Sequence, residues 1–139
     1  MPKTIIIIII RTDIVIHIFG FMEKQEILER RETYMKLLLE FDVFADLIDV
    51  PQHIVEKREY YKKKFLNWLY HPKSKHRFRE NAVDLSGVKF TVMNYRSDAF
   101  VEWLNAKVLK DSEHKAYVIV QDVNNYEQLL NEGVPSIFF

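Results

Sequence analysis

Residues 5–10 read Ile-Ile-Ile-Ile-Ile-Ile, and this tract decides the fold that the sequence predicts. Isoleucine is β-branched and favours strands. Because the tract does not alternate with polar residues, both faces of its strand should be buried. A strand buried on both faces is typical of the middle of a sheet covered by helices on both sides. A second β-favouring run at 14–19 either extends this strand past Asp13 or returns as a hairpin arm.

Outward from this tract, apolar residues at helical spacing predict a helix over 22–41 and another from Pro51 to residue 70. After Gly87 the pattern predicts strands and helices in alternation. The strands are expected at 88–93, 116–120 and 135–139, with helices at 98–110 and 125–132 that begin at the caps Ser97 and Asn125.

Strands that alternate with helices form parallel sheets with right-handed crossovers. The sequence therefore predicts an α/β fold, a single three-layer Rossmann-like domain over residues 1–139 with a mostly parallel central sheet. Residues 21–86 would form a helical insert or cap-like region in this domain.

The composition excludes several classes of protein. The chain has 139 residues, of which 48% are hydrophobic, so it can bury a core and is not expected to be disordered. It has no cysteine and three glycines, which excludes disulfides, thiolate sites and glycine-rich phosphate loops. Arg11 and Asp13 interrupt the N-terminal apolar stretch, so neither a signal peptide nor a membrane span is expected. We expect a cytoplasmic protein with no membrane partner.

Two segments near the C-terminus carry a family resemblance. Val92-Met93-Asn94-Tyr95-Arg96-Ser97 precedes a predicted helix that contains Glu102-Trp103-Leu104, and Tyr117-Val118-Ile119-Val120-Gln121-Asp122 precedes a helix and Gly133-Val134-Pro135. These segments resemble the second and fourth motifs of the haloacid-dehalogenase-like superfamily of phosphatases. The resemblance implies a parallel sheet that begins with residues 5–13, and magnesium-dependent phosphoryl hydrolysis at its edge.

The same resemblance implies candidate catalytic residues, namely Asp13, Asp122 and Asn94, with Asp13 and Asp122 as the metal ligands. The Asp-x-Asp motif of the family falls on Arg11 and Asp13 in this chain. An arginine is a permanent cation, so it can neither attack phosphorus nor bind magnesium. The resemblance therefore indicates a degenerate relative without a cofactor, and magnesium enters only if hydrolysis is retained.

Positive charge is concentrated in residues 57–79. The chain has 20 basic and 20 acidic residues, yet this segment has nine basic residues and one acid, Glu59, for a net charge of +8. The basic residues are Lys57, Arg58, Lys62, Lys63, Lys64, Lys73, Lys75, Arg77 and Arg79. Aromatic residues lie between them in the sequence, namely Tyr60, Tyr61, Phe65, Trp68, Tyr70 and Phe78. Cations neutralise phosphates, and aromatic faces stack on unpaired bases.

Two interpretations of this segment stay open. Its aromatic residues could be core and its lysines a solvated face paired with Glu23, Glu26, Glu29 and Glu32. Alternatively, the segment binds a nucleic acid, another phosphate-bearing partner or an acidic protein.

The leading expectation is a non-catalytic binding protein on a degenerate phosphatase-like scaffold. The alternatives are a metal-dependent phosphoryl hydrolase and a protein-interaction or homo-oligomerising module that uses the apolar end Ile137-Phe138-Phe139.

Overall fold

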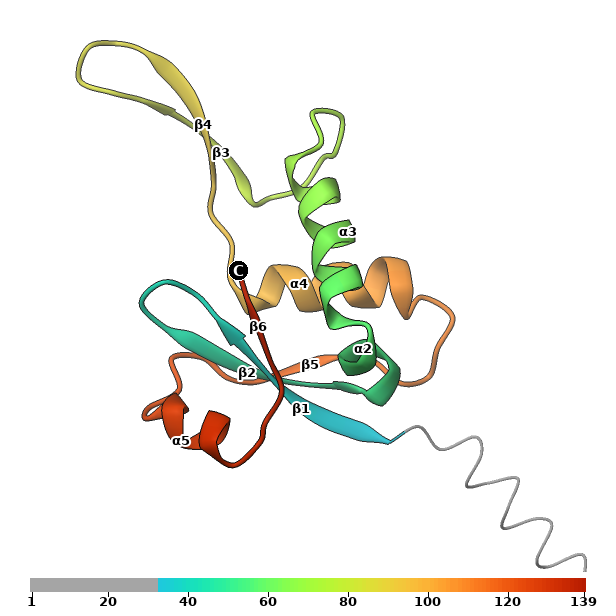
Figure 1. Ribbon diagram of the computed structural model, residues 1–139. Coiled ribbons are helices and arrows are strands. Elements are labelled where there is room, and N and C mark those ends of the chain that lie inside the picture. Colours follow the sequence, from blue (N-terminus) through green and yellow to red (C-terminus); the bar gives the residue numbers. More distant parts are fainter. Residues whose placement is uncertain (1–32) are drawn as a thin grey trace, which may run out of the picture. The chain divides into compact units, whose positions relative to one another are not determined.

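The computed structural model describes residues 33–139, which contain a four-stranded sheet, a two-stranded hairpin and helices (Figure 1). The larger sheet comprises β1 (Tyr34–Glu40), β2 (Ala45–Pro51), β5 (Tyr117–Val120) and β6 (Ser136–Phe138). The hairpin comprises β3 (Arg79–Val83) and β4 (Lys89–Met93). The helices are α2 (Gln52–Glu56), α3 (Arg58–Tyr70), α4 (Ser97–Trp103), the π-helix η1 (Leu104–Val108) and α5 (Tyr126–Asn131).

The sheet is mixed, with strand order β5-β2-β1-β6. Strand β2 pairs antiparallel with both β1 and β5, and the pair of β1 with β6 is parallel. The predicted mostly parallel, Rossmann-like sheet is therefore wrong. The predicted helical insert is wrong as well, because residues 34–51 of that segment form the two central strands. The isoleucine tract at 5–10 and the run at 14–19 lie outside the described residues.

Strand β1 replaces the end of the helix that was predicted over 22–41, whose first part lies outside the described residues. Its three consecutive leucines, Leu37, Leu38 and Leu39, are all fully buried. Leucine favours helices, but this local preference amounts to well under about 1 kcal/mol per residue and packing overrides it. A strand between two helical layers buries neighbouring residues on opposite faces, which explains an apolar run without alternation.

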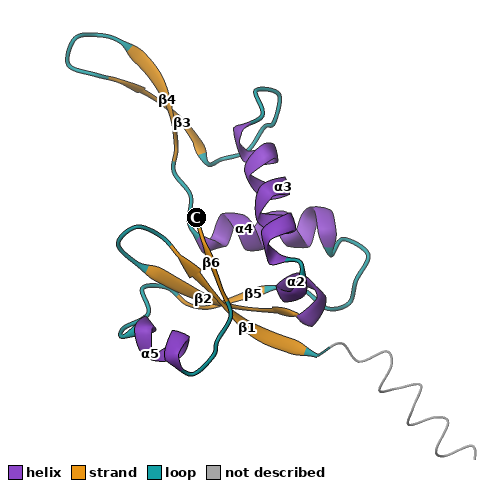
Figure 2. Ribbon diagram, in the orientation of Figure 1, coloured by secondary structure: helices purple, strands orange, loops and turns teal. Residues whose placement is uncertain are grey.

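Helices cover both faces of the sheet (Figure 2). On one face, Leu37, Leu39, Ile48 and Val50 belong to a cluster that also contains core residues of α2, α3 and α4. On the other face, α5 and its flanking residues pack against Leu38, Ala45 and Leu47.

Phe65 of α3 lies at the centre of the first cluster and is fully buried. Its ring lies 5.3–6.1 Å, centroid to centroid, from five other aromatic rings, those of Trp68, Tyr95, Phe100, Trp103 and Phe139. The last residue, Phe139, donates its backbone N–H to the carbonyl of Glu40 at 2.9 Å. The C-terminal end thus completes the core of the same chain.

Several local predictions are confirmed. The helix expected at 51–70 is present as α2 and α3, with a break at Lys57, although Pro51 is the last residue of β2 and the helix begins at Gln52. The strands expected after Gly87 are present as β4, β5 and β6. Asn125 is the N-cap residue of α5, as predicted, but its side chain makes no cap hydrogen bond, and the predicted cap at Ser97 is wrong because Arg96 is the N-cap residue of α4. The Ser97 hydroxyl instead donates to Asp46 on β2, at 2.6 Å.

Candidate functional site

The structure divides the basic residues of the 57–79 segment into two groups. The first group holds the fold together. Arg58 donates hydrogen bonds to the carbonyls of Ser136 and Val55, at 3.0 and 2.8 Å. Lys62 donates to the carbonyl of Phe138. The bonds to Ser136 and Phe138 attach α3 to the C-terminal strand β6, and the bond to Val55 attaches it to α2.

Two more arginines of this group fix the loop after α3. Arg77 forms ion pairs with Glu102 at 3.0 Å and with Asp98 at 3.5 Å. Arg79 donates to three carbonyl oxygens at distances of 2.7–3.3 Å, those of His71, Pro72 and Ser74. These arginines therefore have a structural role, which the sequence pattern did not separate from binding.

The second group consists of five lysines that we call the basic surface, Lys57, Lys63, Lys64, Lys73 and Lys75. All five are exposed. Within residues 33–139, no carboxylate forms an ion pair with any of their ammonium groups. The predicted pairing partners Glu23, Glu26, Glu29 and Glu32 lie outside the described residues. The positive charge of these five lysines is therefore not neutralised by an ion pair within residues 33–139.

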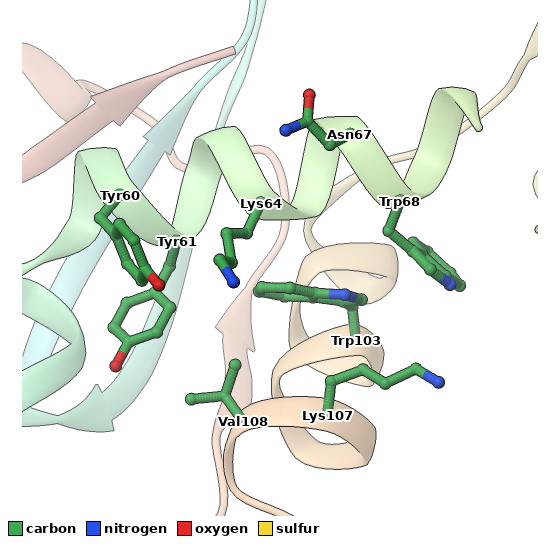
Figure 3. Close-up of a pocket in the computed structure, with 8 residues that line it drawn as sticks. All are labelled: Tyr60, Tyr61, Lys64, Asn67, Trp68, Trp103, Lys107 and Val108. Atoms are coloured by element: carbon green, nitrogen blue, oxygen red, sulfur yellow. The ribbon is translucent and has the colours of Figure 1, made fainter.

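A pocket of about 530 Å³ lies beside this surface, between α3 and the α4–η1 helices (Figure 3). Side chains at helical spacing along one face of α3 form one wall, and residues of α4 and η1 form the other. The lining residues are Tyr60, Tyr61, Lys64, Asn67, Trp68, Trp103, Lys107 and Val108.

The π-helix η1 supplies two of these residues, Lys107 and Val108. Its hydrogen bond from the N–H of Leu109 to the carbonyl of Leu104, at 2.7 Å, spans five residues instead of four. A π-helical turn is rare and changes which side chains face a neighbouring helix, and such turns often occur at functional sites.

The pocket combines aromatic surfaces with positive charge and has no carboxylate among its lining residues. Trp103 is 5% exposed whereas Tyr60 is 54% exposed, so the pocket has a buried floor and an open rim. The Lys64 ammonium lies 5.4 Å from the centre of the Tyr60 ring, within cation–π distance. Burial, and secondarily the neighbouring Tyr60, raise the pKa of Tyr61, which therefore stays a neutral hydrogen-bond donor at physiological pH.

The sequence singled out Tyr60, Tyr61, Lys64 and Trp68 as members of a basic, aromatic segment but predicted no pocket. It did not assign Asn67, Trp103, Lys107 or Val108 to the same surface. Trp103 was expected in the helix that follows Ser97, and no spacing in the sequence indicates that this helix packs against α3. Only the packing of α4 against α3 brings them together.

A second polar cluster lies at the opposite end of α4 and centres on Asp46, whose side chain is fully buried. The Asp46 carboxylate accepts hydrogen bonds from Arg96 Nη2 at 2.7 Å, from the Ser97 hydroxyl at 2.6 Å and from the Asp122 backbone N–H at 3.0 Å. The Arg96 guanidinium also lies over the Phe44 ring, 4.0 Å from its centre. This cluster fastens the start of α4 and the β5–α5 turn to strand β2.

Burial alone would raise the pKa of Asp46, because it disfavours the charged form. The hydrogen bonds from Arg96, Ser97 and Asp122 and the positive charge of Arg96 outweigh that effect and lower the pKa below its usual value. Asp46 is therefore a carboxylate in the folded protein. Asp46 was not among the predicted site residues, although an aspartate within the apolar run Ala45-Asp46-Leu47-Ile48 indicates a buried carboxylate that needs hydrogen-bond partners.

Of the residues predicted to be catalytic, the structure describes Asn94 and Asp122, whose side chains hydrogen-bond to different partners. The Asp122 carboxylate is 67% exposed and accepts a hydrogen bond from Arg96 at 3.1 Å. The Asn94 amide donates to Glu80 at 2.9 Å, and no hydrogen bond joins it to Asp122. Asp13 lies outside the described residues. Residues 33–139 contain no group of three or more His, Cys, Asp or Glu side chains that could hold a metal ion.

None of the helices between residues 33 and 139 is long and apolar enough to cross a membrane. The resemblance to the haloacid-dehalogenase-like superfamily stays a prediction from the sequence, because no family model, no curated protein and no solved structure matches the chain.

Proposed function

We propose that the protein is a non-catalytic binding protein that takes a phosphate-bearing or acidic partner on the basic surface of α3. The observation behind this proposal is that five ammonium groups on one helix and its adjoining loop have no acidic partner in residues 33–139. Lys63 and Lys64 are neighbours in the chain and Lys57 lies six residues before Lys63, so these like charges repel one another. A polyanion removes that repulsion and releases its own condensed counterions.

The charge distribution supports a partner that approaches from one direction. Residues 57–79 carry a net charge of +8, and the rest of the chain has 11 basic and 19 acidic residues, for a net charge of −8. A protein with separated charges of this size attracts and orients a charged partner before contact, at a rate that falls with ionic strength.

Replacing Lys57, Lys63 and Lys64 together with glutamate tests the proposal. We expect the affinity for a fluorescent single-stranded oligonucleotide at low ionic strength to fall at least tenfold, because phosphate contacts are lost. Each lost phosphate contact lowers the slope of log K against log[salt] by about 0.7, so three contacts lower it by about 2. Fluorescence anisotropy at several salt concentrations measures both quantities.

The matched control replaces Lys36, Lys89 and Lys110 with glutamate. These lysines are also exposed, and no ion pair joins them to another described residue. The two triple variants have the same net charge, so a difference between them reports the location of the charge. Equal loss in both variants, or no binding by the unmodified protein, would contradict the proposal.

We place the protein in the cytoplasm as part of this proposal. The chain contains no cysteine, which is compatible with a reducing compartment where disulfides do not contribute to stability.

Self-association is a second candidate function, and the β3–β4 hairpin favours it. Val88, which directly precedes β4, and Phe90 and Val92 on β4 are alternate residues and are 57%, 46% and 39% exposed. A two-stranded hairpin is marginally stable alone in water, and antiparallel pairing of β4 with β4 of a second copy is self-complementary. Light scattering should then give a dimer mass for the protein and a monomer mass for Phe90→Lys. A monomer mass for the unmodified protein would exclude this candidate.

A further inference from the structure

We propose that the pocket between α3 and η1 holds one unpaired base of a single-stranded nucleic acid whose backbone follows the basic surface. This inference rests on the proposed function and names its ligand class.

The walls of the pocket suit a flat aromatic group. Four aromatic side chains line the pocket, those of Tyr60, Tyr61, Trp68 and Trp103 (Figure 3). Its volume of about 530 Å³ falls within the range of about 300–1,000 Å³ that is typical of small-ligand sites. Aromatic side chains stack on bases of any identity, because every base has a π-face.

The charges of the pocket select an anionic aromatic ligand over a neutral one. Lys64 lies on the α3 wall and Lys107 on the η1 wall, and both are exposed. Neither ammonium forms an ion pair within the described region. A nucleotide supplies an aromatic base that packs against the buried floor of the pocket and a negatively charged phosphate that lies near the two lysines.

The positions of the remaining lysines favour a strand over a free nucleotide. Lys57 precedes the pocket residues of α3, whereas Lys73 and Lys75 lie in the loop after the helix ends. A helix of 13 residues is about 20 Å long, so cations are distributed well beyond the reach of one phosphate. A duplex is a poor ligand for the pocket, because its bases are stacked on each other and must be extruded before they can enter.

The tryptophans make the test specific. The chain has two tryptophans, and both line this pocket. Stacking of a base on an indole quenches its fluorescence, so the intrinsic emission reports pocket occupancy. We would titrate the full chain with a ten-nucleotide oligothymidylate and, in parallel, with the same deoxyribose–phosphate backbone without bases.

The oligothymidylate should quench the tryptophan emission and bind about 5- to 150-fold more tightly than the abasic strand, which is the effect of stacking one base. The Tyr60→Ala variant should lose a similar factor for the oligothymidylate and nothing for the abasic strand. Tyr117→Ala is the matched control, because Tyr117 on β5 is 57% exposed and lies outside the pocket.

The alternative outcomes separate this inference from the proposed function. Equal affinity for both strands without quenching would overturn the inference and leave polyanion binding intact. Quenching by thymidine 5′-monophosphate at the same concentrations as the oligomer would overturn the assignment to a strand. Absence of binding to either strand at low salt would overturn both proposals.

Discussion

Replacing Asp46 with alanine is expected to lower the free energy of unfolding by about 2–4 kcal/mol, because it removes a fully buried carboxylate that accepts hydrogen bonds from three donors. The variant leaves Arg96 Nη2, the Ser97 hydroxyl and the Asp122 N–H without the acceptor that all three share. Replacing the acceptor by a methyl group supplies none of these hydrogen bonds. Urea denaturation followed by circular dichroism measures the change.

Asp49→Ala is the control for this prediction. Asp49 lies on the same strand and is partly exposed, and its side chain makes no hydrogen bond or ion pair with another described residue. Its replacement should change the free energy of unfolding by no more than about 0.5 kcal/mol. Similar effects of the two variants would show that the Asp46 cluster contributes little to stability.

The lowered pKa of Asp46 also determines how the free energy of unfolding changes at acidic pH. A carboxyl group whose pKa is lower in the folded state stabilises the protein above its unfolded pKa of about 3.9. That contribution is lost as the pH falls from this value through the folded pKa. The unmodified protein should therefore lose stability below about pH 4 more steeply than Asp46→Asn, which has no such group. Parallel pH profiles for the two proteins would contradict the assignment.

Replacing Phe65 with alanine is the second large effect, and it should lower the free energy of unfolding by about 3–5 kcal/mol. The ring is fully buried and contacts five other aromatic rings, so its removal leaves a cavity that rigid neighbours cannot fill. Because Trp103 is one of these neighbours, near-ultraviolet circular dichroism should change together with the denaturation midpoint.

Tyr117→Ala provides the comparison for Phe65→Ala. Tyr117 lies on β5 and is 57% exposed, so its replacement removes far less buried surface than that of Phe65. We expect a change of less than about 1 kcal/mol. If Phe65→Ala were equally mild, the aromatic cluster would not be the main stabilising element of this face of the sheet.

The elements that the sequence predicted correctly depend on local signals. Pro51 precedes a helical stripe that ends before His71-Pro72, and the segments after Gly87 combine short β-favouring runs with helical ones. The strand over 34–40 was missed for the opposite reason. Its leucines have no strand preference of their own, and their conformation depends on two helical layers that come from later in the chain.

The candidate site shows the same division. The concentration of lysine and aromatic residues in 57–79 is visible in the sequence. The sequence does not show which of these residues are free to bind. Carbonyls and carboxylates that are distant in sequence, or that lie in the loop after α3, accept hydrogen bonds from Arg58, Lys62, Arg77 and Arg79. The second wall of the pocket likewise depends on the packing of α4 and η1.

The sequence by itself determined the helical segment that ends at residue 70, the C-terminal strands and the location of positive charge, since these follow from propensity, periodicity and residue type. Only the tertiary structure decided the mixed strand order, the buried position of Asp46 and the pocket beside α3. Each of these requires residues far apart in the chain to meet, and burial and hydrogen bonding between such residues outweigh the small conformational preferences that a sequence pattern records.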